Sequence, residues 1–259
     1  MLPKNHTKEA LAGDGWAFGA RSNSFSPDLV EVYGELGLDF VWLDIEHGGP
    51  SAEDATGLEH LVRAATVADV DLMVRLPSND PSVVRKVLDT GVRTVVVPRV
   101  ETAADVRRAA RAAFYTYDGG PGERGVAHAR GSSWGADLDT DREDGSVLVG
   151  AMIENRTAVE NIEEILSVPG VGFAYLGPGD LAVSMGHPGE SDHPDVREVT
   201  ETAREACVDA GVPIGVSVTG IEGAEAALDA GHRIVRLGDE MEAVRELVGG
   251  RLDAVRERG

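Results

Sequence analysis

Four short polar clusters stand where apolar runs of the sequence stop. They are Asp44 to His47, Arg75, Glu154, and Gly177 to Asp180. Continuous apolar runs are typical of buried parallel strands, and catalytic groups of α/β enzymes collect at the carboxyl ends of such strands. The pattern therefore predicts that these clusters share one rim of a parallel sheet.

Glu154 and Asp180 are the carboxylates that most suggest a metal site. Each follows a predicted buried strand, where an isolated carboxylate is costly unless it is paired with a cation. Two carboxylate ligands with open positions suit a hard divalent ion such as Mg²⁺ or Mn²⁺, with Co²⁺ as a substitute. The simpler interpretation is that each carboxylate caps the helix that follows it, as Asp often does.

The segment Gly177 to Leu181 is a glycine turn that opens a helix. Backbone N–H groups at such a turn, here near Gly179 and Asp180, can bind an anion. The Lys-Ser/Thr pair of a P-loop is missing, so a small carboxylate fits this turn better than a nucleotide phosphate.

His47 and Arg75 are candidates for acid–base and electrostatic chemistry. An imidazole at a strand end can act as general acid and base. A permanently charged guanidinium can stabilise an enolate or bind a carboxylate. A single His or Arg is more often structural, and it is the predicted common rim that favours a functional role.

Lysine occurs only at Lys4, Lys8 and Lys86. None of the three follows a predicted strand, so no lysine is placed to form a Schiff base with a carbonyl substrate. If the protein processes a carbonyl compound, we expect it to use a metal.

The elements that must position these residues alternate along the chain. Helical apolar spacing separates the strands, and glycines stand at the expected helix ends. The alternation predicts a single (β/α)₈ TIM barrel domain over residues 1–259. The eight predicted strands are Trp16 to Arg21, Asp39 to Asp44, Asp71 to Arg75, Thr94 to Pro98, Val147 to Ile153, Gly172 to Leu176, Pro213 to Val218 and His232 to Leu237.

One long segment, residues 115–146, has no periodicity. Long loops in compact domains are usually functional or disordered. We expect Gly119 to Trp134 to lie near the active-site mouth and the acidic stretch Asp137 to Asp144 to be solvated, although a flexible insertion without a role is an alternative.

Composition excludes several classes of partner. The net charge is −21, so nucleic acid is an unsuitable ligand. No segment resembles a signal peptide or a membrane span, which predicts a cytoplasmic protein. Cys207, the only cysteine, lies in a helical apolar pattern and is expected to be a buried structural thiol.

At the polar clusters the chain resembles the HpcH/HpaI family of metal-dependent class II pyruvate aldolases. The resemblance extends from about Trp16 to Asp239. Its most specific motifs are the Asp-x-Glu-His stretch at Asp44 to His47 and the Gly-Pro-x-Asp-Leu stretch at Gly177 to Leu181. Supporting matches are Val74 to Asp80, Val97 to Ala103, Ile153 to Ala158, Gly186 to Gly189 and His193 to Pro194.

This resemblance implies a barrel of the phosphoenolpyruvate/pyruvate-binding type, usually assembled as a homo-hexamer. It also implies roles for the residues that match. The resemblance implies that Glu154 and Asp180 are metal ligands and that N–H groups near Gly179 and Asp180 bind the pyruvate carboxylate. It implies that His47 carries protons through a bound water and that Asp44 and Asp89 orient His47. It implies that Arg75 stabilises the pyruvate enolate.

The leading hypothesis is reversible cleavage of a 4-hydroxy-2-oxo acid to pyruvate and an aldehyde. Met152, Gly179 and Ala182 depart from residues common in the family, which leaves the choice of aldehyde open. A lyase acting on acyl-CoA thioesters such as malyl-CoA or citryl-CoA is the first alternative. A catalytically inert barrel is the second.

The acidic surface also predicts adaptation to a salt-rich cytoplasm, where screening weakens repulsion between like charges. We expect the melting temperature to rise between low and molar KCl. A melting temperature that falls over this range would refute the idea.

Overall fold

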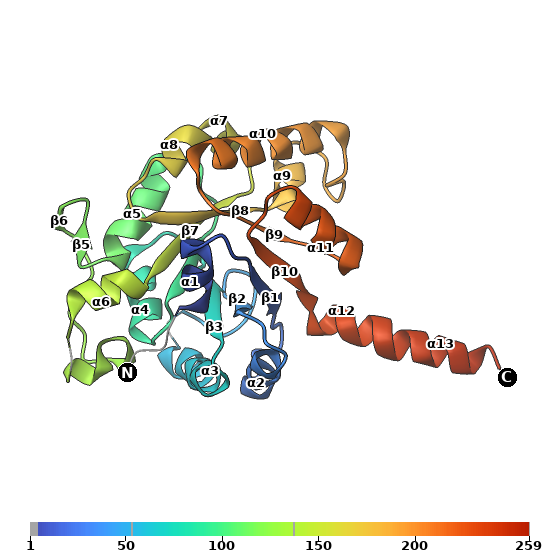
Figure 1. The fold of residues 1–259 in the computed structure, drawn as a ribbon, viewed down its shortest axis with the longest axis horizontal. Helices are drawn as coiled ribbons and strands as arrows, with labels where there is room; N and C mark the ends of the chain where they lie inside the picture. The colour runs from blue at the N-terminus through green and yellow to red at the C-terminus, as the bar shows by residue number, and fades with distance from the viewer. Residues whose placement is uncertain (1–4, 53, 137, 259) are drawn as a thin grey trace.

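Eight parallel strands close into a barrel in the computed structural model, which describes residues 5–52, 54–136 and 138–258 (Figure 1). The order around the barrel is β1, β10, β9, β8, β7, β4, β3, β2. All eight predicted strands are confirmed, with ends that differ by at most two residues. Their bounds are β1 Ala17–Arg21, β2 Phe40–Asp44, β3 Asp71–Arg75, β4 Thr94–Val97, β7 Leu148–Ile153, β8 Val171–Leu176, β9 Ile214–Ser217 and β10 Ile234–Asp239.

Large side chains fill the inside of the barrel, and branched side chains pack between the barrel and its helices. In β2, Phe40 and Trp42 belong to the inner cluster, while Val41 and Leu43 belong to the outer one. This alternation follows from the two-residue period of a strand. Glycines make room for the rings, since a Cβ at Gly150 would overlap the ring of Phe173. The barrel is therefore a packed core whose polar chemistry is confined to its ends.

Helices surround the barrel, and their apolar faces cover it (Figure 1). Among the described residues, no helix is both long and apolar enough to cross a membrane. The helices are α1 His6–Ala12, α2 Pro27–Glu35, α3 Ala55–Ala68, α4 Pro81–Asp89, α5 Ala103–Ala113, α7 Arg156–Glu160, α8 Ile162–Leu166, α9 Pro178–Ser184, α10 Pro194–Ala210 and α11 Gly220–Asp229.

The last helices leave the barrel as an arm, which comprises residues 240–256. They are α12 Glu240–Val244, the π-helical turn η2 Arg245–Gly249 and α13 Gly250–Arg256. Figure 1 shows the arm as one rod that points away from the barrel and ends at the C-terminus.

The segment 115–146 lies at the amino ends of the strands, opposite the rim that carries the polar clusters. It includes β5 Thr116–Tyr117, β6 Gly120–Pro121, η1 Arg130–Gly135 and α6 Thr140–Ser146. Arg93, which directly precedes β4, binds both Gly131 O and Glu143. The segment connects the end of α5 to the start of β7, which places it at the amino ends of the strands. The prediction that Gly119 to Trp134 lies near the active-site mouth of the same chain is therefore wrong.

The predicted acidic, solvated stretch is also more ordered than expected. Asp137 lies outside the described residues, and Asp139 and Asp141 are exposed. Glu143, however, is fully buried and pairs with two arginines, with its Oε2 3.1 Å from Arg93 Nη2 and 3.4 Å from Arg124 Nη2. Burial raises the pKa of Glu143, although the two guanidinium groups act in the opposite direction. One buried ion pair network thus fixes this segment to the barrel.

Replacing Glu143 with Ala would leave two buried guanidinium groups without a counter-charge. We expect the free energy of unfolding in urea to fall by about 3 kcal/mol. Glu160→Ala, which removes an exposed pair with Arg156, is the control and should cost about 0.5 kcal/mol or less. Equal stability of the two variants would show that the segment is not fixed by this network.

Candidate active site

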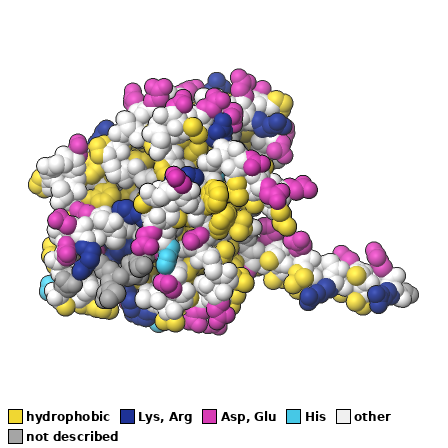
Figure 2. Space-filling model, in the orientation of Figure 1, with side chains coloured by type: hydrophobic (Ala, Val, Ile, Leu, Met, Phe, Trp, Pro, Cys, Tyr) yellow, Lys and Arg dark blue, Asp and Glu magenta, His cyan; other side chains and the backbone are white. Residues whose placement is uncertain are grey.

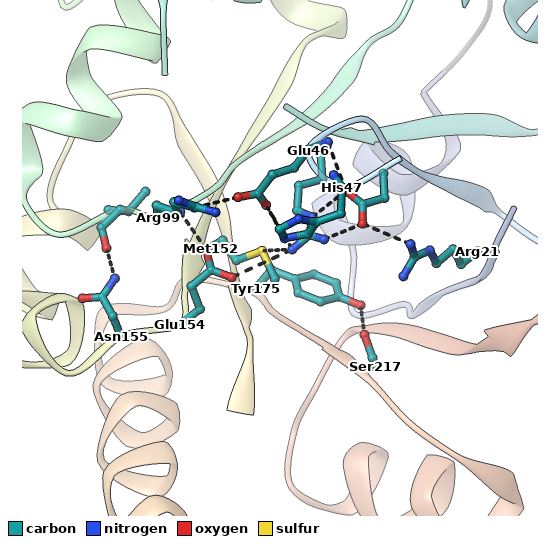
Figure 3. A network of polar contacts seen from close by, with 12 residues as sticks. Arg21, Glu46, His47, Arg99, Met152, Glu154, Asn155, Tyr175 and Ser217 are labelled. Atoms are coloured by element: carbon teal, nitrogen blue, oxygen red, sulfur yellow. Dashed lines mark hydrogen bonds and ion pairs between the residues drawn. The ribbon is translucent and has the colours of Figure 1, made fainter. Parts of the chain in front are cut away.

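Asp44 and Arg75 meet because they are the last paired residues of neighbouring parallel strands, β2 and β3. Arg75 donates two hydrogen bonds to the carboxylate, one from Nε to Oδ1 at 3.0 Å and one from Nη2 to Oδ2. Arg21, at the end of β1, adds a contact from Nη2 to Asp44 Oδ2 at 3.2 Å. Figure 3 shows Arg21 and Glu46 on opposite sides of this group of contacts.

The other end of the same guanidinium faces two further carboxylates. Arg75 Nη1 lies 3.2 Å from Glu46 Oε2 and 4.0 Å from Glu154 Oε2 (Figure 3). The exposed fractions of the side chains are 1% for Asp44, 6% for Glu46 and Glu154, and 9% for Arg75. One buried cation is therefore shared by three buried carboxylates.

The backbone after β4 positions Glu154. Arg99 has a left-handed backbone conformation, with φ of 50°, and its N–H donates to Glu154 Oε1 at 2.7 Å. The Arg99 side chain reaches over the rim, and its Nε donates to Glu46 Oε1 at 2.8 Å. Non-glycine residues in this conformation cluster at functional sites.

The helix-cap interpretation of the two predicted metal ligands is wrong. Asn155, and not Glu154, caps α7, since its side chain accepts the N–H of Ala158 at 2.8 Å. The cap residue of α9 is Gly177, and Asp180 lies inside the first turn of that helix. Neither carboxylate is thus occupied as a helix cap.

The electrostatics of these carboxylates depend on burial and on their charged neighbours. Burial raises the pKa of Glu154, and the nearby charges of Glu46 and Asp180 raise it further. Burial also acts to raise the pKa of Asp44, but its hydrogen bond and charge contact with Arg75 outweigh this and hold that pKa below its ordinary value. Asp44 therefore forms a stable ion pair with Arg75, whereas the negative charge of Glu154 is not balanced by a close cationic group.

A divalent cation fits this arrangement. Oε2 of Glu154 is a buried oxygen without a hydrogen-bond partner among the described residues. Asp180 is exposed on α9, close enough to influence the titration of Glu154. Carboxylate oxygens with surplus negative charge are the donor set that Mg²⁺ and Mn²⁺ prefer. Glu154 and Asp180 are thus suited to hold such an ion.

His47 lies at the exposed edge of the site. Its Nε2 is 3.6 Å from Glu46 Oε2. The backbone N–H groups of Glu46 and His47 donate to Asp44 Oδ1 at 3.2 and 3.3 Å. Asp44 thus holds the backbone turn that carries His47, and in this chain the carboxylate nearest to the imidazole belongs to Glu46.

Asp89 is not part of this rim. It ends α4, which runs from the carboxyl end of β3 to the amino end of β4. The charges that act on Asp89 come from Arg124, Arg85, Arg93 and Lys86, while burial raises its pKa. Its expected role of orienting His47 therefore cannot be filled within one chain.

The sequence patterns did not single out Glu46, Arg99 or Arg21. Glu46 had a usable signal, because it stands two residues after Asp44 in the Asp-x-Glu-His stretch. Arg99 had no such signal, because its role depends on a left-handed turn after β4.

Below the rim, Tyr175 forms a hydrogen bond with Ser217 at 2.9 Å and packs against Trp42 with ring centroids 4.6 Å apart. These rings form the floor of the site.

The comparisons with known proteins agree with this fold. A family model described as HpcH/HpaI aldolase/citrate lyase matches residues 18–246. The chain is 31% identical over 240 residues to a hydroxypyruvate/pyruvate aldolase of Paraburkholderia phytofirmans, with 92% of each chain covered. It is 32% identical over 259 residues to a 4-hydroxy-2-oxovalerate aldolase of Novosphingobium aromaticivorans, covering 100% of this chain and 97% of the relative.

Solved structures are similar as well. The crystal structure of an HpcH/HpaI aldolase/citrate lyase family protein from Burkholderia cenocepacia aligns with a TM-score of 0.90 and 29% identity, covering 98% of this chain and 100% of that one.

The pairing of Asp44 with Arg75 predicts a pH-dependent contribution to stability. The pKa of Asp44 is lower in the folded chain than the unfolded value of about 3.9. Its ionised form therefore stabilises the fold above that pH, and the stabilisation is lost as the pH falls through the folded pKa.

Asp44→Asn should lower the free energy of unfolding by about 3 kcal/mol at pH 7, because it breaks a buried ion pair. The difference from the unmodified protein should shrink below about pH 4. Urea unfolding at both pH values measures this, with the exposed Asp14→Asn as control. A difference that does not change with pH would contradict the ion pair.

Proposed function

The chain belongs to the HpcH/HpaI aldolase/citrate lyase family and is a carbon–carbon lyase, and we propose that it reversibly cleaves a 4-hydroxy-2-oxo acid to pyruvate and an aldehyde with a bound divalent cation. The observation that carries this proposal is the buried Oε2 of Glu154, which has no hydrogen-bond partner among the described residues, with the charge of Asp180 close enough to raise the pKa of Glu154. A buried carboxylate of this kind costs stability unless a cation offsets its charge.

Glu154 and Asp180 would hold the cation. When bound, a divalent ion supplies Lewis-acid polarisation of the 2-oxo group. The charge of Glu46 contributes to the field at this position, since it raises the pKa of Glu154. Mg²⁺ and Mn²⁺ are the ions that suit these oxygen donors, and Co²⁺ is an acceptable substitute.

The carboxylate of the 2-oxo acid would bind at the start of α9. In a helix the first N–H groups have no partner within the helix, and in α9 the capping residue Gly177 offers no side-chain hydrogen bond. The N–H groups of Gly179 and Asp180 are therefore available for a substrate carboxylate. Their position beside Asp180 would bring the 2-oxo acid to the proposed cation.

The residues of the chain would then divide the chemistry. His47, acting through a bound water, takes the proton of the 4-hydroxyl group. The C3–C4 bond breaks, the carbonyl of the aldehyde forms, and the electron pair passes into the enolate of pyruvate. Arg75 stabilises the enolate oxygen by charge and hydrogen bonding. Protonation of C3 gives pyruvate, and the reverse sequence forms the aldol.

The aldehyde half of the substrate is set by other side chains. Relatives with this much identity are named for different substrates, among them a hydroxypyruvate/pyruvate aldolase and a 4-hydroxy-2-oxovalerate aldolase. Arg99 and His47 are exposed groups at the rim, and each lies beside Glu46. We propose that they contribute to selection of the aldehyde.

We also propose that the protein acts as a homo-oligomer. The arm carries apolar side chains with 42–69% exposure at Met241, Val244, Leu247, Val248, Leu252 and Val255. Spacings of three residues place Met241 and Val244 on one face of α12 and Leu252 and Val255 on one face of α13, and Figure 2 shows apolar side chains along the projecting rod. We propose that a second copy of this acidic chain packs against that face. A sedimentation experiment that gives the mass of a single chain would exclude the homo-oligomer.

Assembly would also give Asp89 its expected role. Asp89 and the segment 115–146 lie at the amino ends of the strands in their own chain. If either acts in catalysis, it acts at the rim of another copy. The hexamer that the resemblance implies is the arrangement that we propose, in a salt-rich cytoplasm.

The alternative of an acyl-CoA thioester lyase has less support. Recognition of the CoA phosphates needs unpaired basic groups at the rim. Arg21, Arg75 and Arg99 are each already paired with a carboxylate. An inert barrel would not need a buried charge cluster at the strand ends, because that cluster adds no packing.

Exchange of the C3 protons of pyruvate in D₂O, followed by NMR with Mg²⁺ present, tests enolate formation without knowledge of the aldehyde. Glu154→Gln should slow the exchange at least roughly 100-fold, because it removes one charge of the proposed metal site. Glu160→Gln, on exposed α7, should exchange at the rate of the unmodified protein. EDTA should stop exchange, and added Mg²⁺ should restore it. Full exchange in Glu154→Gln would overturn the assignment.

A further inference from the structure

The loop between α9 and α10 brings two imidazoles and a carboxylate together, separately from the cluster around Arg75. His187, Glu190 and His193 each offer a ligand atom, and these atoms lie within 4.8 Å of one another. Both histidines are half-buried and Glu190 is exposed. The proposed aldol chemistry does not use any of the three.

The backbone of the loop builds this cluster through two successive turns. Glu190 N–H donates to His187 O at 3.0 Å, and His193 N–H donates to Glu190 O at 2.9 Å. Gly186 and Gly189 have φ of 84° and 82°, a left-handed conformation that glycine adopts without strain. The three residues therefore recur at every third position on one side of the loop.

The two imidazole rings are stacked, with centroids 3.6 Å apart and an interplanar angle of 16°. Asp195 lies beside both, with Oδ2 3.9 Å from Nε2 of His187 and 4.0 Å from Nδ1 of His193. Metal-binding histidines usually donate their second ring N–H to a carboxylate. Both distances exceed that of a hydrogen bond, so Asp195 would accept a ring N–H only after the rings turn out of this stack. The same turn is needed for the in-plane lone pairs of the two rings to converge on one ion.

We propose that His187, Glu190 and His193 form a second metal site that binds a borderline divalent cation, with Zn²⁺ as its best-fitting member. Two imidazoles and one carboxylate are a ligand set that Zn²⁺ accepts, with water in the fourth position. Imidazole donors favour Zn²⁺, Co²⁺, Ni²⁺ and Cu²⁺ over Mg²⁺. The site thus differs in chemistry from the all-oxygen site at Glu154 and Asp180.

A bound ion would join the two ends of the loop. His187 follows the end of α9, and its N–H is bonded to Ala182 O at 2.8 Å. His193 is the residue that precedes α10, and its Nδ1 accepts the N–H of Asp195 at 3.3 Å. Binding of an ion through Nε2 would put the ring proton of His193 on Nδ1, so this long hydrogen bond would be lost, and Nδ1–H would donate to the Asp195 carboxylate once the ring has turned toward it. The ion would therefore fix the α9–α10 connection beside the helix that carries Asp180.

Calorimetric titration with ZnCl₂ tests the site in the Glu154→Gln protein, in which the other proposed site is weakened. We expect one Zn²⁺ per chain at the loop. The double variant His187→Ala, His193→Ala should lose this binding event, and Asp195→Asn should weaken it roughly tenfold, as loss of a carboxylate behind a metal-bound histidine does. His60→Ala, at an exposed histidine of α3, is the control and should bind as before.

Co²⁺ provides a second readout, because its visible absorption reports the ligands around it. The loop site should give a spectrum that disappears in the double variant and changes in Glu190→Gln, which keeps both imidazoles. Unchanged Zn²⁺ affinity and an unchanged Co²⁺ spectrum in both variants would overturn the site. Pyruvate exchange in the unmodified protein with Mg²⁺ is measured separately, so failure of this proposal is distinguishable from failure of the proposed function.

Discussion

One buried guanidinium shared by three buried carboxylates is the interaction on which the candidate site is built. Arg75 donates two hydrogen bonds to Asp44, which Arg21 also contacts. Only one nitrogen of Arg75 remains for Glu46 and Glu154. A low-dielectric environment makes an unbalanced carboxylate costly. Glu154 is thus the carboxylate that lacks a balancing charge, and we propose that a cation binds there.

The barrel enforces this concentration of charge by its geometry. Parallel strands bring the residues after β2, β3 and β7 to the same rim. Large rings below the rim, including Trp42 and Tyr175, exclude water from underneath. The left-handed turn at Arg99 then aims a backbone N–H at Glu154. Core packing, strand register and the left-handed turn at Arg99 together orient the carboxylate of Glu154, whose burial would otherwise be energetically costly.

The sequence predicted the parts of the molecule that depend on local patterns. Apolar runs and glycines at helix ends located every barrel strand, and strand ends located Asp44, Arg75 and Glu154. The segment 115–146 was placed at the wrong end of the barrel, although its position between a predicted helix and a predicted strand implies the amino ends of the strands. The role of Asp89 came from the resemblance alone and not from a local pattern. Glu143 looked solvated by composition, and only the tertiary structure brings Arg93 and Arg124 to it. The apolar spacing of the arm indicates helix, but it carries no signal for the direction in which the arm leaves the barrel, since that direction is a property of the assembled fold.

An anomalous difference map from crystals grown with Mn²⁺ and pyruvate would show directly whether the buried carboxylate of Glu154 belongs to a cation site. We predict a peak bound by the carboxylates of Glu154 and Asp180, with the pyruvate carboxylate at the N–H groups of Gly179 and Asp180 and Arg75 facing its 2-oxo group. A map without Mn²⁺ at these carboxylates, in crystals that hold pyruvate elsewhere, would contradict the cation site.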